Sequence, residues 1–184
     1  KNIFHEKGRG KIFDELCDIY SFKEDINLLV AIYRNVKPTL ELYSDAANLL
    51  KQVKGKYGLG IITDGIGTVQ WNKIEALGLK KYMDKIIVTD DYGKDFWKPS
   101  VKPFQKMMDY FGGQPEEYVY IGDNPTKDFM GPKKLGMYSI RIVREVGDYM
   151  KLTVSLEIEA DYTIFSLLDL LRVLIFLKEK RNES

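Results

Sequence analysis

The sequence predicts an α/β fold: a three-layer, Rossmann-like arrangement in which a parallel sheet has helices on both faces. Two observations support this fold class. From residue 60 onward, short apolar runs alternate with longer stretches whose apolar residues recur at helical spacing. Strands that read as continuous apolar runs are typical of parallel sheets covered on both sides. Before residue 60 only helical spacing occurs, so the sheet is expected to follow a helical segment.

Three helices are predicted ahead of the first strand. Residues 12–20 and 26–33 each place apolar side chains on one helical face. A third helix is expected over residues 46–53, where Ser44 and Asp45 offer an N-cap.

Short apolar runs predict the strands of the sheet. They span residues 60–62, 86–88, 118–121, 138–143 and 162–164. The first three runs end in polar residues, namely Thr63-Asp64, Asp90-Asp91 and Asp123. Because ligands of parallel α/β sheets bind at the carboxyl ends of the strands, these residues are candidates for a functional site.

The remaining stretches predict the helices that flank the sheet. They span residues 69–77, 101–111, 127–135 and 166–177. Gly78, Gly112 and Gly136 follow the first three of them, as is usual at helix ends. The charged tail, residues 178–184, is expected to fray.

Composition and charge exclude several classes of protein. The 184 residues are 45% hydrophobic and 30% charged, which excludes disordered and collagen-like chains. A formal net charge of +1 gives no electrostatic argument for nucleic acid or membrane as a partner. No apolar run reaches the roughly 18 residues that a membrane span needs. With Cys17 as the single cysteine, no intrachain disulfide forms, and a reducing, cytoplasmic setting is expected.

Two short motifs have residues suited to binding phosphate. In Thr63-Asp64-Gly65, a hydroxyl and free backbone N–H groups follow a buried strand and can bind a phosphate oxygen. Taken alone, a simple helix-capping turn is the better interpretation of this triplet. Lys98 precedes Pro99 and a predicted helix, a position from which it can neutralise a phosphate, although taken alone a solvated surface lysine is the better interpretation.

The segment Gly122-Asp123-Asn124-Pro125-Thr126-Lys127-Asp128 gives the sharpest signal. A buried strand delivers Asp123 to the edge of the sheet, and the following turn returns Asp128 to the same loop. Two converging carboxylates repel each other unless a cation lies nearby. Oxygen ligands of this kind suit Mg²⁺, which keeps several waters and is often completed by a substrate phosphate. A strand end and a helix start would be the alternative explanation.

Together, these three motifs resemble those of the haloacid dehalogenase-like hydrolases, a superfamily of mostly Mg²⁺-dependent phosphatases. Residues 61–65 are similar to the family's second motif, Lys98-Pro99 with Phe104 to its third, and residues 121–128 to its fourth. The resemblance covers residues 33–171. It also implies that residues 1–36 are a remnant of the helical cap that these enzymes insert after their first motif, and that residues 37–184 form the hydrolase core.

The resemblance implies a role for each matching residue. The turn Thr63-Asp64-Gly65 would bind the substrate, Thr63 through its hydroxyl and Gly65 through its amide. Lys98 would neutralise the phosphate and the nucleophile. Asp123 would bind Mg²⁺. Asp128 would support the metal through a bridging water or by holding the groups that bind it. Thr63, Lys98 and Asp123 are thus the implied catalytic residues, acting on a small phosphorylated metabolite.

The family's first motif, an Asp-x-Asp on the first strand that supplies the nucleophile, does not occur in these 184 residues. The nearest substitute, Asp14, lies in a predicted helix. In the family this strand is central, and its removal would leave two rows of unpaired backbone groups and a slot through the core. We therefore expect the strand to come from residues outside this sequence, since the chain starts with Lys1, or the slot to be filled by another segment.

The leading hypothesis is a hydrolase of small phosphate monoesters that works through an aspartyl-phosphate, with Mg²⁺ as cofactor, and that lacks turnover in these 184 residues alone. One alternative is a non-catalytic member that kept the phosphate and metal pocket. Another is a phosphoacceptor receiver domain, which also has acidic strand ends and a lysine before a helix. Neither the substrate nor the oligomeric state follows from the sequence.

Overall fold

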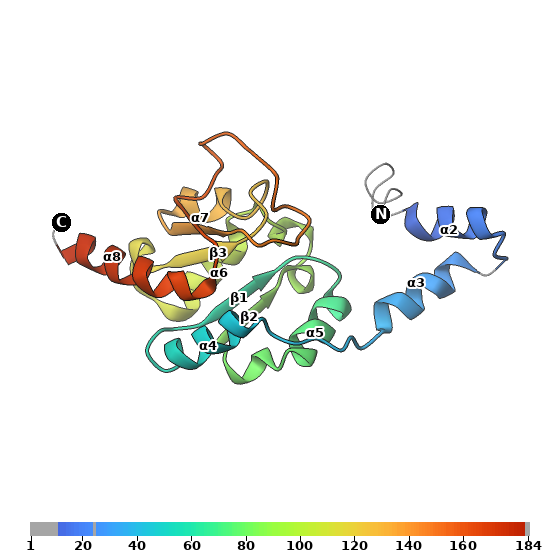
Figure 1. Ribbon diagram of the computed structural model, residues 1–184, viewed down its shortest axis with the longest axis horizontal. Helices are drawn as coiled ribbons and strands as arrows, with labels where there is room; N and C mark the ends of the chain where they lie inside the picture. Colours follow the sequence, from blue (N-terminus) through green and yellow to red (C-terminus); the bar gives the residue numbers. More distant parts are fainter. Residues whose placement is uncertain (1–10, 24, 183–184) are drawn as a thin grey trace.

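The computed structural model describes residues 11–23 and 25–182. Two helices, α2 (Ile12–Tyr20) and α3 (Ile26–Asn35), lie to one side of an α/β body that contains the strands (Figure 1). The α3 helix begins at Asp25, whose carboxylate accepts a hydrogen bond from the Asn27 amide at 2.8 Å. Both helices were predicted from their apolar spacing.

All the strands pair in parallel, as predicted, but they form two sheets rather than one. β1 (Gly60–Thr63) pairs with β2 (Lys85–Val88), with Ile62 opposite Ile87. The second sheet has the order β3-β4-β5. Its strands are β3 (Val119–Gly122), β4 (Tyr138–Ile142) and β5 (Tyr162–Ile164). Within residues 11–23 and 25–182, no strand pairs with both β1 and β3, so the two sheets share no hydrogen-bonded ladder.

Helices cover both faces of the second sheet. On one face, α4 (Ser44–Val53) and α8 (Leu170–Asn182) enclose a cluster of buried residues: Leu49, Val53, Ile140, Ile164 and Leu170. On the other face, Phe104 of α6 (Lys102–Phe111) packs edge-on against the ring of Tyr120, with the two centroids 4.9 Å apart. Tyr120 points away from the cluster because alternate side chains of a strand point to opposite faces.

The first sheet is shorter and is flanked by α5 (Gly67–Ala76), which follows β1 directly. Short 3-10 turns carry the chain from β2 to α6. None of the helices within residues 11–23 and 25–182 is long and apolar enough to cross a membrane.

Two predicted helix starts were wrong. Tyr43, rather than Ser44 or Asp45, is the N-cap of α4, because the Asp45 carboxylate accepts hydrogen bonds from Ala46 and from the distant Leu167 amide. The helix predicted from residue 127, α7 (Met130–Leu135), begins three residues late, after a polar turn around Asp128.

The tail predicted to fray continues α8 as helix as far as Asn182, while residues 183–184 lie outside the described part. Arg181, near its end, forms an ion pair with Glu117 at 2.9 Å. Lysine, glutamate and arginine are good helix formers, so the charge of this segment does not oppose a helix.

Candidate active site

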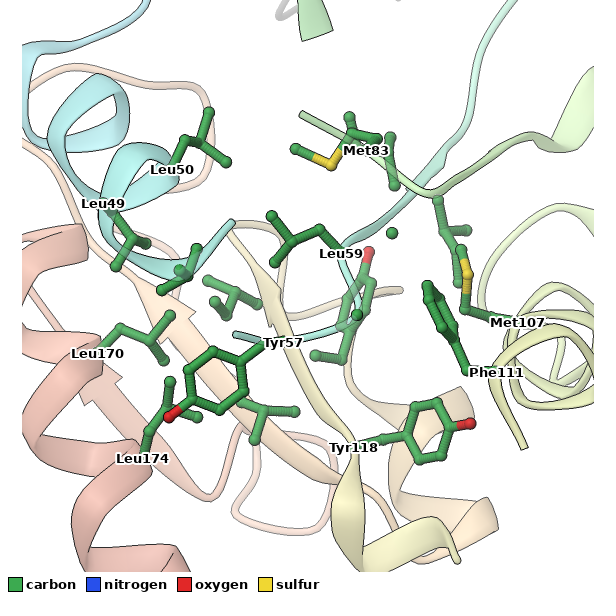
Figure 2. Close-up of a pocket in the computed structure, with 18 of the residues that line it drawn as sticks. Leu49, Leu50, Tyr57, Leu59, Met83, Met107, Phe111, Tyr118, Leu170 and Leu174 are labelled. Carbon is green, nitrogen blue, oxygen red and sulfur yellow. The ribbon is translucent and has the colours of Figure 1, made fainter. Parts of the chain in front are cut away.

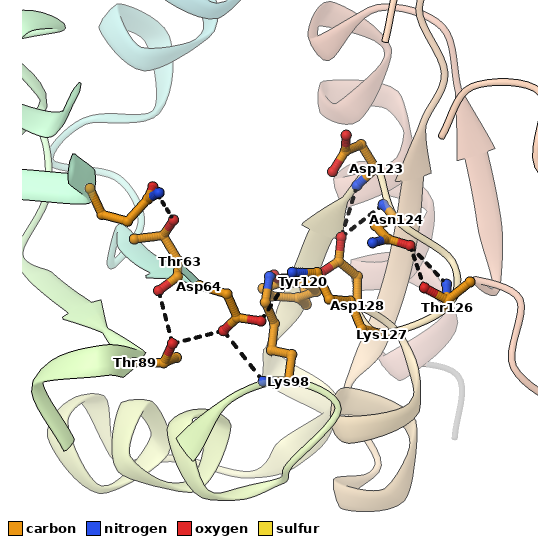
Figure 3. Close-up of polar contacts among 11 residues, drawn as sticks. Thr63, Asp64, Thr89, Lys98, Tyr120, Asp123, Asn124, Thr126, Lys127 and Asp128 are labelled. Carbon is orange, nitrogen blue, oxygen red and sulfur yellow. Dashed lines mark hydrogen bonds and ion pairs between the residues drawn. The ribbon is translucent and has the colours of Figure 1, made fainter. Parts of the chain in front are cut away.

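Polar side chains from both sheets meet at the carboxyl ends of β1 and β3 (Figure 3). Two of them, Asp64 and Lys98, come from the loops that follow β1 and precede α6. Two others, Lys127 and Asp128, come from the turn after β3. The ion pair between Lys127 Nζ and Asp64 Oδ2, at 3.1 Å, spans the gap between the two sheets.

The turn after β1 is built around Asp64. Its carboxylate accepts a hydrogen bond from the Thr89 hydroxyl at 2.8 Å and one from the Lys98 amide at 3.3 Å. Thr63 Oγ1 lies 2.9 Å from Gln70 Oε1, at the start of the next helix. Gly65 has φ +127°, where a side chain would be strained and would also meet Gln70. The turn therefore presents a fixed carboxylate toward Lys98 and Lys127.

Lys98 is the most deeply buried cation of the site, with a side chain that is only 8% exposed. Its ammonium donates to Asp128 Oδ1 at 2.6 Å and to the Tyr120 hydroxyl at 3.0 Å. Burial disfavours its charged form, but the neighbouring Tyr120 and Asp128 outweigh that effect and raise the pKa of Lys98. Burial also raises the pKa of Tyr120 to about 12, so its hydroxyl stays protonated. A permanent positive charge is thus fixed at the base of the cleft.

Asp128 also organises the turn that follows β3. Its second oxygen accepts hydrogen bonds from the Asp123 amide at 3.1 Å and the Asn124 amide at 2.9 Å. Gly122 leaves room for this approach, because a Cβ there would lie 2.6 Å from Asp128 Oδ2. Asn124 Oδ1 in turn accepts from the Thr126 amide and hydroxyl at 3.1 and 2.7 Å. Both oxygens of Asp128 are therefore engaged with the protein itself.

Asp123 lies at the rim of this turn and fits a magnesium ligand. Burial and the negative charge of Asp128 raise the pKa of its carboxyl, which means that a nearby cation would stabilise the ionised form. Within the described part of the chain, no group of three or more histidine, cysteine or acidic side chains is placed to hold a metal ion. A magnesium ion held by Asp123 would therefore take its other ligands from water, substrate phosphate or residues outside the chain.

Of the predicted site residues Thr63, Lys98, Asp123 and Asp128, the structure joins Lys98 to Asp128 directly, and Asp64 accepts a hydrogen bond from the Lys98 amide. The backbone amide of Asp123 donates a hydrogen bond to Asp128. The Thr63 hydroxyl, at the end of β1, contacts Gln70 instead. The Asp64 carboxylate, which the resemblance placed in a substrate-binding turn, forms an ion pair with Lys127.

Sequence reasoning missed three residues of the site: Tyr120, Lys127 and Thr89. Tyr120 had a signal, because a tyrosine within an apolar buried strand needs a polar partner for its hydroxyl. Lys127 stands next to Asp128 in the motif, but only the fold shows that its ammonium crosses to Asp64. Thr89 follows β2 and is fully buried, as expected of a hydroxyl that serves a neighbouring strand end.

A buried lysine paired with a carboxylate lies at the carboxyl edge of parallel strands, the edge at which α/β proteins bind their ligands. Comparison with known proteins identifies the family. The family model "Haloacid dehalogenase-like hydrolase" matches residues 4–142. The chain therefore belongs to the haloacid dehalogenase-like hydrolases.

Relatives in this family are phosphatases. The chain is 33% identical to the glyceraldehyde 3-phosphate phosphatase of Methanocaldococcus jannaschii over 96% of this chain and 78% of the relative. It is 35% identical to the enzyme of the same name from Pyrococcus furiosus, over 84% of this chain and 62% of that protein. These relatives assign the chain to the phosphatases of the family.

Solved structures agree on the fold. A HAD phosphatase from Thermococcus onnurineus shares 26% identity with a TM-score of 0.63, and covers 94% of this chain and 76% of that one. A putative HAD-hydrolase from Bacillus subtilis, solved bound to magnesium, has a TM-score of 0.73 at 23% identity, again over 94% of this chain and 76% of that one.

Proposed function

We propose that this chain carries the phosphate-binding and metal-binding part of a Mg²⁺-dependent phosphatase that acts on a small phosphate monoester through an aspartyl-phosphate. The buried ammonium of Lys98 carries this proposal, because it fixes a positive charge 2.6 Å from Asp128 at the edge where the two sheets meet. A lysine in this position neutralises phosphate as a point charge. Membership of a phosphatase family gives the reaction class.

Each residue has one task in this mechanism. Lys98 offsets charge on the phosphate, and Thr63 and the Gly65 amide orient the phosphoryl oxygens. Asp123 would hold Mg²⁺, which supplies further charge neutralisation when bound. Asp128 keeps Lys98 and the loop amides in place and would reach the metal through water.

The nucleophile is an aspartate outside residues 1–184. Its carboxylate oxygen forms a bond to phosphorus while the bond from phosphorus to the ester oxygen breaks, which leaves an acyl phosphate. The leaving oxygen takes a proton from water and departs as an alcohol. Water then cleaves the acyl phosphate, releases inorganic phosphate and restores the carboxylate. Because Thr63, Lys98, Asp123 and Asp128 all bind or neutralise charge, none of them serves as the attacking group.

We propose a three-carbon phosphate such as glyceraldehyde 3-phosphate as the first substrate to test, because two relatives carry that name. Specificity would come partly from α2 and α3, which we assign to a helical cap over residues 1–36. The Asn72 side chain donates a hydrogen bond to the Val36 carbonyl at 3.3 Å and so ties the end of this segment to α5.

The binding half of the proposal can be tested on the 184-residue chain. Isothermal titration should detect inorganic phosphate binding that requires Mg²⁺. Lys98→Met should abolish phosphate binding, and Asp123→Asn should weaken Mg²⁺ binding at least about tenfold, with a smaller effect for Asp128→Asn. The matched controls Lys102→Met and Asp95→Asn, from an exposed ion pair, should change neither affinity. Unchanged Mg²⁺ affinity in Asp123→Asn would remove the metal assignment.

An activity assay tests the catalytic part of the proposal. The 184-residue chain should not hydrolyse p-nitrophenyl phosphate or glyceraldehyde 3-phosphate, because positioning and electrostatics have no nucleophile to act on. A longer form with an Asp-x-Asp strand should hydrolyse both. Turnover by the 184-residue chain that Asp14→Asn abolishes would instead make Asp14 the nucleophile, although it lies on helix α2. Phosphate binding without turnover in either form would favour the non-catalytic alternative.

A further inference from the structure

Lys127 forms an ion pair that joins the two sheets. Its ammonium lies 3.1 Å from Asp64 Oδ2 (Figure 3). The two residues follow β3 and β1 respectively, strands that share no hydrogen-bonded ladder within residues 11–23 and 25–182. The fold therefore places Lys127 beside the turn after β1, which the proposed function assigns to phosphate.

Asp64, the partner of Lys127, brings a negative charge to that turn. One oxygen of its carboxylate accepts hydrogen bonds from the Thr89 hydroxyl at 2.8 Å and from the Lys98 amide at 3.3 Å. These donors are neutral, so the charge stays in place. In the part of the chain that the structure describes, Lys127 is the one cation that forms an ion pair with Asp64. The Asp64 side chain is only 10% exposed, so without Lys127 a poorly hydrated carboxylate would repel a bound anion.

Lys127, Asp64, Lys98 and Asp128 form a chain of alternating charge. The Lys98 amide donates to Asp64, and the Lys98 ammonium donates to Asp128. The two cations differ in exposure, because the side chain of Lys98 is 8% exposed and that of Lys127 is 33% exposed. Lys98 is therefore the fixed charge of the site, whereas Lys127 lies at the end that solvent reaches.

The turn after β3 gives neighbouring residues opposite partners. The Asn124 carbonyl accepts hydrogen bonds from the Lys127 amide at 3.2 Å and from the Asp128 amide at 2.9 Å. With the backbone held in this way, the Lys127 side chain reaches Asp64 and the Asp128 side chain reaches Lys98. The turn that carries Asp123, the proposed magnesium ligand, thus also fixes the position of Lys127.

The charges of the site are nearly balanced. Three carboxylates, those of Asp64, Asp123 and Asp128, stand against the two ammonium groups of Lys98 and Lys127. Loss of Lys127 would therefore double the net negative charge of the site. The strands that precede these charges, over residues 60–62 and 119–121, line an apolar cavity (Figure 2). Apolar surroundings strengthen the interaction between charges, so one charge has a larger effect here than on an exposed surface.

We propose that Lys127 is a positioning residue of the site. It neutralises Asp64 and holds that carboxylate away from a bound anion, which raises the affinity for phosphate and lowers the affinity for Mg²⁺ alone. Lys127 acts through Asp64 and does not contact phosphate itself. The part that concerns phosphate rests on the proposed function, whereas the neutralisation of Asp64 does not.

Isothermal titration of the 184-residue chain measures both affinities, first with Mg²⁺ alone and then with inorganic phosphate at saturating Mg²⁺. Lys127→Met should weaken phosphate binding at least about fivefold and tighten Mg²⁺ binding about threefold, because loss of a positive charge acts oppositely on an anion and a cation. Lys127→Arg keeps the charge and should hold both affinities within about twofold of the unmodified chain. The control Lys102→Met, from an exposed ion pair, should change neither affinity.

Variants of Asp64 separate action through this residue from direct contact with phosphate. Asp64→Asn keeps an acceptor for Thr89 but removes the charge, so it should tighten phosphate binding and weaken Mg²⁺ binding. In the double variant Asp64→Asn/Lys127→Met, phosphate affinity should recover to within about threefold of the unmodified chain, because no charge is left to neutralise. Failure to recover would show that Lys127 contacts phosphate itself and would overturn the positioning role.

The coupling between the two charges can also be measured without any ligand. Urea unfolding of the unmodified chain, the two single variants and the double variant should give a coupling that changes the unfolding equilibrium constant at least about fivefold. The same cycle for the exposed pair of Asp95 with Lys102 should give less than about twofold.

The outcomes distinguish this inference from the proposed function. Clear coupling in a chain that binds no phosphate would reject the proposed function and leave the neutralisation of Asp64 in place. Absence of coupling would overturn the inference even if phosphate binds. Phosphate and Mg²⁺ affinities that fall together in Lys127→Met would also overturn it, because a merely structural change moves both affinities in one direction.

Discussion

Lys98 and Asp128 show how single residues divide structural and chemical tasks. Their side chains are 8% and 3% exposed, and the two charges lie 2.6 Å apart. Taking such a pair out of water costs about as much as its attraction returns, so the pair adds little net stability. The pair instead holds a cation in place where β1 and β3 end. The other oxygen of Asp128 accepts hydrogen bonds from two amides of the loop.

Removing one partner of this pair should be costly. Asp128→Ala leaves the Lys98 ammonium buried without its carboxylate and should lower the free energy of unfolding by about 3–5 kcal/mol. Asp95→Ala breaks the ion pair with Lys102, in which the side chains of Asp95 and Lys102 are 81% and 53% exposed. It should lower the free energy of unfolding by about 0–1 kcal/mol. Urea unfolding of the two variants measures both values. Equal losses would show that Lys98 is not held in a dry environment.

Asp45 should make stability depend on pH. Burial alone would raise the pKa of its carboxyl, but the Leu167 amide and the Arg144 guanidinium, 3.1 Å away, outweigh it and hold the pKa below its usual value of 3.8. The ionised form is favoured in the folded state, so its contribution is present above pH 3.8 and is lost as the pH falls through the lower folded value.

Asp45→Asn should therefore cost about 1.5–3 kcal/mol at neutral pH, with a difference from the unmodified protein that shrinks below about pH 4. Urea unfolding at a series of pH values measures this dependence. Asp95→Asn, on an exposed pair, should show a small difference at every pH. A difference for Asp45→Asn that stays constant into acid would mean that its charge is not the source of the stability.

At the scale of elements, α6 and α7 pack closely because α7 carries a glycine at the contact. A Cβ on Gly131 would lie 2.5 Å from Phe104 Cε2 and 3.1 Å from the Ser100 carbonyl oxygen. Phe104 is 1% exposed and contacts Tyr120 on its other side, so it has no room to move away. This contact holds α6, and the Lys98 loop before it, against the turn after β3.

Gly131→Ala should therefore destabilise the protein by about 1–3 kcal/mol, although alanine is the better helix former. The exposed change Lys134→Ala in the same helix should stay within about 0.5 kcal/mol of the unmodified protein. Thermal unfolding of both variants measures the difference. A neutral or stabilised Gly131→Ala variant would show that Phe104 has space to shift.

Elements were predictable wherever local periodicity decided them. Apolar runs located the strands, and helical spacing located most helices, because both signals are written in consecutive residues. Predicted helix boundaries were wrong where contacts outside the helix determine them. The Asp45 carboxylate binds the Leu167 amide instead of capping α4, and the turn held by Asp128 delays the start of α7. The candidate site divides in the same way. The short motifs of the sequence contain Asp64, Lys98 and Asp128, whereas the contact of Lys127 with Asp64 exists only in the folded chain.

At the scale of the whole molecule, the two sheets are connected without sharing a ladder. α6 follows the Lys98 loop and packs on both sides of the gap, and the pair of Lys127 with Asp64 crosses the cleft. The second sheet has the larger buried cluster, around Ile140, which is fully buried. The first sheet consists of two four-residue strands, and residues 60–62 of β1 line a cavity of about 680 Å³.

This asymmetry predicts two levels of stability in one chain. Opening β1 and β2 breaks no hydrogen bond to β3, so their amides should exchange through a sub-global opening with a lower free energy than the global one. The amides of Ile140 and Arg141, which lie where β4 pairs with strands on both sides, should require global unfolding. Native-state hydrogen exchange at increasing urea measures both levels. Lys127→Met, which removes the charge bridge to Asp64, should lower protection in β1 and β2 more than in β4. A single exchange free energy shared by β1, β2 and β4 would contradict this, because it would mean that α6 alone couples the two sheets as tightly as a continuous ladder does.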